Sequence, residues 1–119
     1  MRTGVGLGMA AIDLMIDYGD PVGPLLCCMT HRVLLVPVAS GTADVWHAAH
    51  SDCETGPFLR CCATPGPKSP CDHRYWIAPP SQTQQITDAT TLHHYLSLVR
   101  ARMRHTVSSH QPTELMCHA

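Results

Sequence analysis

The clearest pattern of apolar and polar positions lies near the C-terminal end of the chain, between Asp88 and about His105. At about 100° per residue, five apolar residues of this stretch fall within a stripe about 100° wide, and mostly polar residues lie opposite it. Asp88 belongs to the residue types that cap the N-termini of helices. The pattern therefore predicts an amphipathic helix over about 88–105, in a segment 87–107 that is followed by a flexible tail, 108–119. The stripe consists of Leu92, Tyr95, Leu96, Val99 and Met103.

Weaker patterns predict three further elements. Residues 9–18 place apolar side chains at helical spacing, and Gly19 is suited to end a short helix there. Residues 33–38 are rich in valine and leucine and predict a strand. Because Pro37 has no amide hydrogen to donate, we expect this strand at the edge of a sheet or Pro37 at the end of the strand. Residues 75–77 predict a very short strand.

The composition limits how much of the chain we expect to be ordered. Isoleucine, leucine, valine and phenylalanine together make up about a fifth of the 119 residues, and the net charge is only −1. We expect a small α+β chain or a mostly irregular one, with partial disorder. Residues 1–50 would form a weakly ordered N-terminal segment of helix and strand. Residues 51–86 would form a loop rich in cysteine, proline and glycine and then a polar linker.

Cysteine and histidine residues gather in the middle of the chain and suggest a zinc site. Zinc takes four soft or borderline ligands in a tetrahedron, usually delivered as close pairs on separate turns. The sequence contains no Cys-x-x-Cys pair, so reduced cysteines without a metal, and disulfides in an oxidising compartment, remain alternatives for its seven cysteines. Zinc is the one cofactor that the sequence suggests. The candidate ligands are His47, His50, Cys53, Cys71 and His73.

Three hypotheses for function follow from these patterns. The first is a non-catalytic protein that binds an unidentified protein partner through the apolar stripe of the 88–105 helix. The second is a small zinc-stabilised module that uses the cluster within 47–73. The third is a recently arisen or alternative-frame product without a stable fold.

Other functions are not expected from this sequence. No catalytic motif of any specificity occurs, so we do not expect an enzyme. The small basic excess of the C-terminal half does not predict nucleic-acid binding. The longest apolar region, 25–39, is interrupted by His31 and Arg32, so no membrane span is expected, and neither is a cleavable signal. We expect a small soluble protein in the cytosol, or in the nucleus by diffusion.

Overall fold

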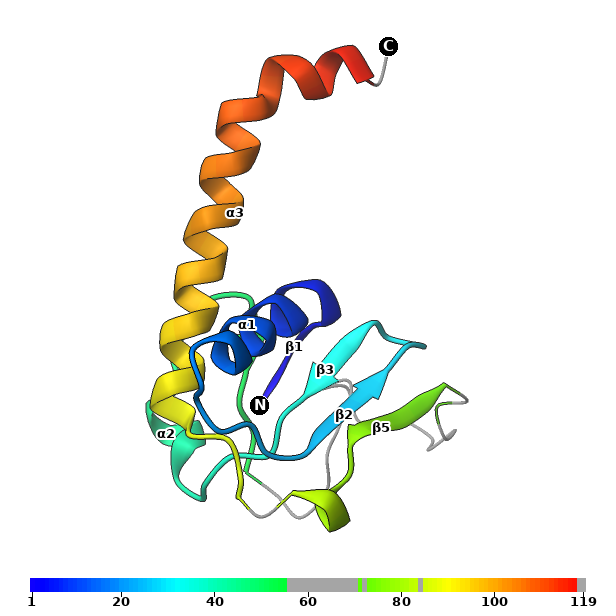
Figure 1. Cartoon of the computed structure of the whole chain (residues 1–119), viewed down its shortest axis with the longest axis vertical. Helices are drawn as coiled ribbons and strands as arrows, with labels where there is room; N and C mark the ends of the chain where they lie inside the picture. The colour runs from blue at the N-terminus through cyan, green and yellow to red at the C-terminus, as the bar shows by residue number, and fades with distance from the viewer. Residues whose placement is uncertain (56–70, 72, 84, 118–119) are drawn as a thin grey trace.

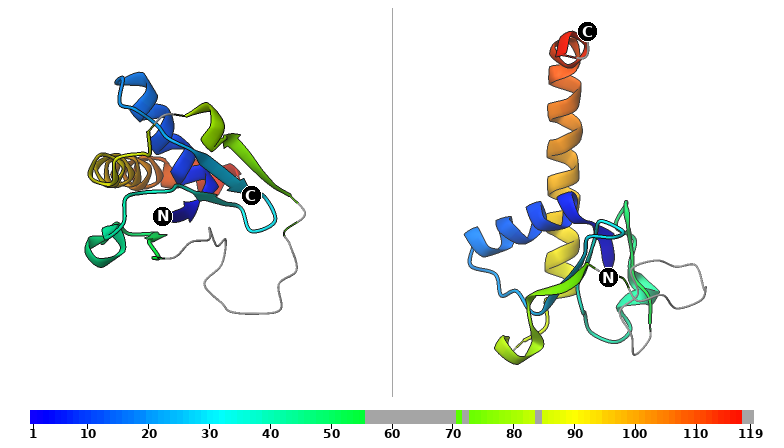
Figure 2. Two further views of the ribbon diagram at one scale, coloured as in Figure 1. Left: turned by 90° about the horizontal axis from the view of Figure 1, so that it is seen from below. Right: turned by 90° about the vertical axis from the view of Figure 1, so that its right-hand side faces the viewer.

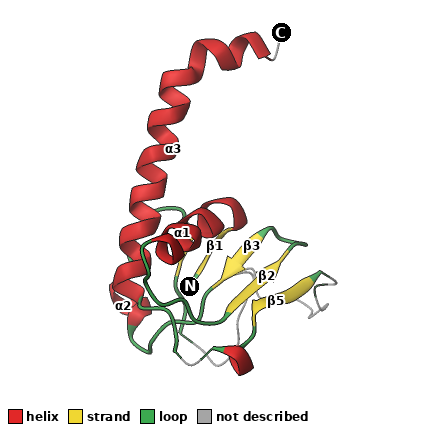
Figure 3. Ribbon diagram, viewed as in Figure 1, coloured by secondary structure: helices red, strands yellow, loops and turns green. Residues whose placement is uncertain are grey.

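The part of the chain that the structure describes contains five short strands and three α-helices (Figures 1 and 3). The structure is a computed structural model, and it describes residues 1–55, 71, 73–83 and 85–117, with side chains as far as Arg104. All pairings between the strands are antiparallel, and the sheet has the order β4-β1-β3-β2-β5. The chain is therefore an α+β protein. In chain order the elements are β1 (Arg2–Gly4), α1 (Val5–Asp17), β2 (Leu25–Cys28), β3 (Val33–Leu35), α2 (Thr42–Val45), β4 (Ser51–Asp52), β5 (Arg74–Ala78), the 3-10 helix η1 (Pro80–Gln82) and α3 (Ala89–Cys117).

The strand predicted over 33–38 exists, but of the two alternatives for it the place at a sheet edge is wrong. β3 is the third of five strands and pairs with β1 on one side and β2 on the other. The reason is that β3 ends at Leu35, so Pro37 follows the strand and is not required to donate within the ladder. Leu34 and Leu35 are fully buried, as expected for a central strand. The short strand predicted at 75–77 is confirmed as part of β5, which is one of the two edge strands.

The N-terminal helix begins earlier than the predicted 9–18 segment. α1 starts at Val5, and Gly8 lies in its second turn with no side chain between the helix and the sheet. A β-carbon on Gly8 would come within 2.8 Å of side-chain atoms of both Thr3 and Leu34. Gly8 therefore lets α1 lie directly on β1 and β3. On the same side of the helix, Ile12 and Met15 are buried in the core.

α3 covers the predicted helical range and continues beyond it to Cys117. Its first turn is capped as the sequence predicts, because Asp88 Oδ2 accepts hydrogen bonds of 2.9 Å from both the backbone amide and the hydroxyl of Thr91. These hydrogen bonds hold the pKa of Asp88 below its ordinary value of 3.8. The later turns of α3 extend past the sheet and α1 (Figures 1 and 2). The flexibility predicted for 108–119 stays a prediction.

The hydrophobic core lies where α1, the first turns of α3 and the sheet meet. α1 and α3 cross closely, as the right-hand view of Figure 2 shows. The core is closed beneath them by β2, β3 and the residues around Val36. The sheet edge that carries β5 lies away from this contact, and its aromatic side chains, Tyr75 and Trp76, remain partly exposed. The buried residues of this core are Met1, Ala11, Ile12, Met15, Leu25, Leu34, Val36, Leu92, Tyr95, Leu96 and Val99.

Candidate metal centre

Two cysteines and one histidine meet at the end of the sheet where the β2–β3 hairpin turns. Cys28 is the last residue of β2, and His31 lies in the turn that leads to β3. Cys71 precedes β5, which pairs with β2 on its other side. The backbone amide of Met29 donates a 2.9 Å hydrogen bond to the carbonyl of His73, which extends the β2–β5 pairing beyond Cys28. This pairing brings together residues that are 40 positions apart in the sequence.

The geometry of the three side chains is compatible with a shared metal ion as well as with hydrogen bonds. The Sγ atoms of Cys28 and Cys71 lie 3.4 and 3.5 Å from the same nitrogen, Nδ1 of His31. A ring nitrogen offers one lone pair or one hydrogen, so it forms one well-directed hydrogen bond and does not serve both thiols equally. In a tetrahedral zinc site with ordinary bond lengths, sulfur and nitrogen ligand atoms are about 3.6 Å apart.

All three possible ligand atoms lie within 4.8 Å of one another. Two thiolates and a neutral imidazole form a soft and borderline donor set of charge −2, which balances a divalent ion. Cys28 is fully buried, Cys71 is partly buried and His31 is exposed. An ion at this position could therefore be reached from solvent, and its fourth coordination position could be filled by water.

The neighbouring cysteine on β2 does not belong to this group. Alternate side chains of a strand point to opposite faces, so Cys27 and Cys28 lie on opposite sides of β2. The thiol of Cys27 donates to Met29 Sδ at 3.5 Å. Cys27 also interacts with the hydroxyl of Tyr75 and thereby raises the pKa of this tyrosine. The vicinal pair therefore supplies one ligand to the candidate centre, and its second sulfur faces away from the other two.

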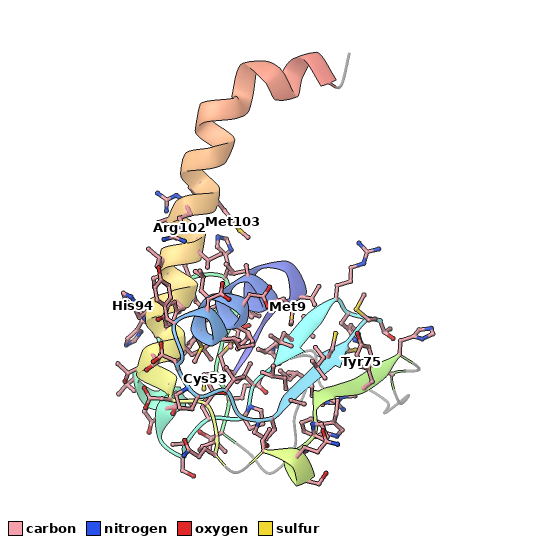
Figure 4. The ribbon with its side chains drawn as sticks, viewed as in Figure 1. Met9, Cys53, Tyr75, His94, Arg102 and Met103 are labelled. Carbon is pink, nitrogen blue, oxygen red and sulfur yellow. The ribbon has the colours of Figure 1, made fainter. Side chains whose placement is uncertain are left out.

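Only one of the five predicted ligands contributes its side chain to this group. Cys71 is part of it, whereas the side chain of His73 is not, and the carbonyl of His73 accepts the hydrogen bond from the Met29 amide. Cys53 follows β4, the strand at the opposite edge of the sheet from β5. Figure 4 shows it well apart from Tyr75 of β5. Cys53 lies near the α-amino group of Met1, whose pKa is lowered by burial, and Cys53 opposes this shift.

The two predicted histidine ligands before β4 also lie outside this group. His47 and His50 are exposed, and His50 has a left-handed backbone with φ of 58°. Its carbonyl accepts a 3.0 Å hydrogen bond from the hydroxyl of Thr3, so this turn is held against β1. Within the described part of the chain, Cys28, His31 and Cys71 are the one group of three or more metal-ligating side chains.

Sequence reasoning missed Cys28 and His31, although a short signal was present. Cys28-Met29-Thr30-His31 has the Cys-x-x-His spacing that places two ligands on one turn, directly after an apolar run. A criterion based on Cys-x-x-Cys pairs does not select this segment, because its second ligand-type residue is a histidine.

The apolar stripe that was predicted to bind a partner lies mostly inside the protein. Leu92 and Leu96 are each 1% exposed, and Val99 is 5% exposed. Tyr95 is 9% exposed and stacks on Tyr18. These four side chains pack against α1 and the sheet, whereas Met103, farther along α3, is 42% exposed (Figure 4). The stripe therefore serves the core of the chain as far as Val99.

Comparisons with known proteins found no relative of this chain. No protein-family model, curated protein or solved structure matches the chain. Among the described residues, none of the helices combines the length and the apolar character needed to cross a membrane.

Proposed function

We propose that this chain is a small metal-stabilised α+β protein in which Cys28, His31 and Cys71 bind one zinc ion. The observation that carries the proposal is the approach of two sulfur atoms to one imidazole nitrogen at 3.4 and 3.5 Å. These distances are close to the spacing of about 3.6 Å in a tetrahedral zinc complex, so binding would need little rearrangement of Cys28 or Cys71 around His31.

The position of the centre suggests a stabilising role. A bound ion would link the β2–β3 turn to the residue that precedes β5, and so close a loop of more than 40 residues. Because the site forms only in the folded state, metal binding adds directly to the free energy of unfolding. This function is supported better than partner binding through the apolar stripe, because four of the five stripe residues are buried in the core.

Cobalt substitution tests the ligand set directly. The reduced protein would be titrated with Co²⁺ and then with Zn²⁺, and the stoichiometry would be counted by native mass spectrometry. We expect one metal per chain and a thiolate-to-cobalt charge-transfer band, which zinc abolishes. Cys71→Ser and His31→Ala should weaken binding about 10- to 100-fold or more, because each removes one of three protein ligands.

Cys53→Ser is the matched control, since Cys53 is a partly buried cysteine at the far edge of the sheet. It should bind cobalt as the wild type does. Binding without a charge-transfer band, or binding that is lost in Cys53→Ser and kept in Cys71→Ser, would refute the proposed ligand set.

A further inference from the structure

A small pocket lies between α3 and the segment that follows α2. Its volume is about 110 Å³, well above the roughly 10–15 Å³ of cavity that a single water molecule requires. It is lined by Ala48, Ala49, Ser97, Arg100, Ala101 and Arg104. The three alanines leave the space open, and the polar lining consists of one hydroxyl and two guanidinium groups. Among the described residues, no carboxylate lines it.

One of these guanidinium groups has a buried donor without an acceptor. Nε of Arg100 is inaccessible to solvent and forms no hydrogen bond within the described part of the chain. Buried polar atoms in folded proteins nearly always have a partner, so a donor of this kind beside a cavity indicates an acceptor that enters from outside. Arginine suits oxyanions in particular, because its planar group donates two parallel hydrogen bonds to a pair of oxygen atoms.

The helical spacing places Arg104 and Ser97 on the same side of α3 as Arg100, next to the pocket. Ser97, Arg100 and Arg104 are related by three and four residues, which places them within an arc of about 60° on α3. This arc is separate from the one that carries the buried stripe. Arg102 lies outside both the arc and the pocket lining, and Figure 4 shows it on the exposed part of α3.

The opposite wall of the pocket is held in place by its own hydrogen bonds. Trp46 Nε1 donates to Ser51 Oγ at 2.8 Å, and Ser51 Oγ donates to the carbonyl of Ala48 at 2.8 Å. The Trp46 ring also meets His93 of α3 edge to face, with centroids 5.3 Å apart. Ala48 and Ala49 are thereby fixed against the helix, so the pocket exists before any ligand enters.

We propose that this pocket binds a phosphate group, with Arg100 and Arg104 as its charged donors and Ser97 as a neutral one. Two guanidinium charges match a phosphate dianion, and the pocket is large enough for one such group and too small for an extended ligand. This inference goes beyond the proposed function and is independent of it. The pocket is lined by residues of α3 and of the segment after α2, and none of the three candidate metal ligands lines it.

Inorganic phosphate is the probe for the first experiment. Binding to the full chain would be measured by isothermal titration calorimetry at constant ionic strength, with sodium acetate in a parallel titration. We expect saturable binding of one phosphate per chain and at least 10-fold weaker binding of acetate. Arg100→Lys keeps the charge and lacks the Nε donor, so it should weaken phosphate binding at least fivefold while the helical circular dichroism is unchanged.

Arg102→Gln is the control for general charge effects on α3, and it should bind phosphate within twofold of the wild type. Arg104→Gln should weaken binding at least fivefold. The proposal would be overturned if wild-type protein bound phosphate no better than acetate, or if Arg102→Gln lost as much affinity as Arg100→Lys. Should Arg100→Lys fail to fold, the comparison of Arg104→Gln with Arg102→Gln still tests the proposal. It is overturned if these two variants bind phosphate equally well.

Discussion

The hydroxyl of Tyr95 donates a 2.7 Å hydrogen bond to Asp20 Oδ2, a carboxylate 75 residues earlier in the chain. Asp20 follows the end of α1, and its backbone amide donates to the carbonyl of Met15 at 2.8 Å, which fixes its position. The ring of Tyr95 stacks on Tyr18 with centroids 6.0 Å apart. This contact joins α3 to the C-terminal end of α1 at the border of the core.

The same contact predicts a loss of stability in alkaline solution. Asp20 accepts the hydrogen bond from the phenol and raises the pKa of Tyr95 above its ordinary value of 10.0, so the folded chain keeps the phenolic proton to higher pH than the unfolded chain. The resulting stability is fully present below about pH 10 and is lost as the pH rises through the folded pKa. Tyr95→Phe should reduce the fall in free energy of unfolding between about pH 9 and pH 11. Equal pH dependence in the two proteins, measured by urea unfolding, would contradict this.

Leu96→Ala tests whether the apolar stripe of α3 belongs to the core. Leu96 is 1% exposed, and removing most of a buried leucine side chain costs about 2–5 kcal/mol of the free energy of unfolding. Met103→Ala is the matched control on the same helix, because Met103 is 42% exposed and should change stability by less than about 0.5 kcal/mol. Urea unfolding followed by circular dichroism measures both. Similar, small effects at the two positions would show that Leu96 is not packed as described.

Gly23→Ala should destabilise the protein strongly because the added methyl group meets backbone atoms. A β-carbon there would lie 2.7 Å from Ile86 Cα and 2.8 Å from the backbone nitrogen of Thr87. The Gly23 amide also donates to the Thr87 hydroxyl at 2.9 Å, so the two segments cannot separate without losing this bond. We expect a loss of more than about 2 kcal/mol.

Gly6→Ala is the control for Gly23→Ala. Gly6 lies in α1 with no atom within 4 Å of the position of an added β-carbon. Alanine favours helix over glycine, so stability should be unchanged or raised by up to about 1 kcal/mol. If thermal unfolding showed equal losses for both variants, the close approach at Gly23 would not be the cause.

The element that the sequence located best is the one whose apolar pattern repeats over several helical turns. The stripe from Leu92 to Val99 repeats over several turns, so the first half of α3 could be located from the sequence, although the surface it packs on could not. β2 has four buried residues and no alternation of apolar and polar side chains, and β1 has only three residues. Strands of this kind carry no periodic signal, and only their pairing reveals them.

The candidate metal centre could be predicted only in part for a related reason. Cys71 could be predicted as a candidate ligand because of its residue type and its place in a cysteine-rich segment. Its partners, Cys28 and His31, come from another part of the chain and meet it because β5 pairs with β2. Spacing along the sequence identifies candidate ligands that are close to each other in the chain, such as His47 and His50. It does not show which strands pair, and here the pairing of β5 with β2 brings distant residues together.

Zinc should raise the thermal stability of the reduced protein, and this effect should depend on His31. At a free zinc concentration of 100 times Kd, binding to the folded state adds about 2.7 kcal/mol, which corresponds to a rise in Tm on the order of 10 °C for a chain of this size. The gain should shrink as the pH falls from about 7.5 to 5.5, because zinc binds thiolates and neutral imidazole in competition with protons. Differential scanning calorimetry with added zinc and with a chelator measures the shift in Tm.

His31→Ala should lose most of this shift and His73→Ala should keep it, since His73 takes part in the local structure through its backbone carbonyl. A rise in Tm that is equal in wild type and His31→Ala would place zinc elsewhere on the chain, and no rise in any of the three would argue against a metal-stabilised fold.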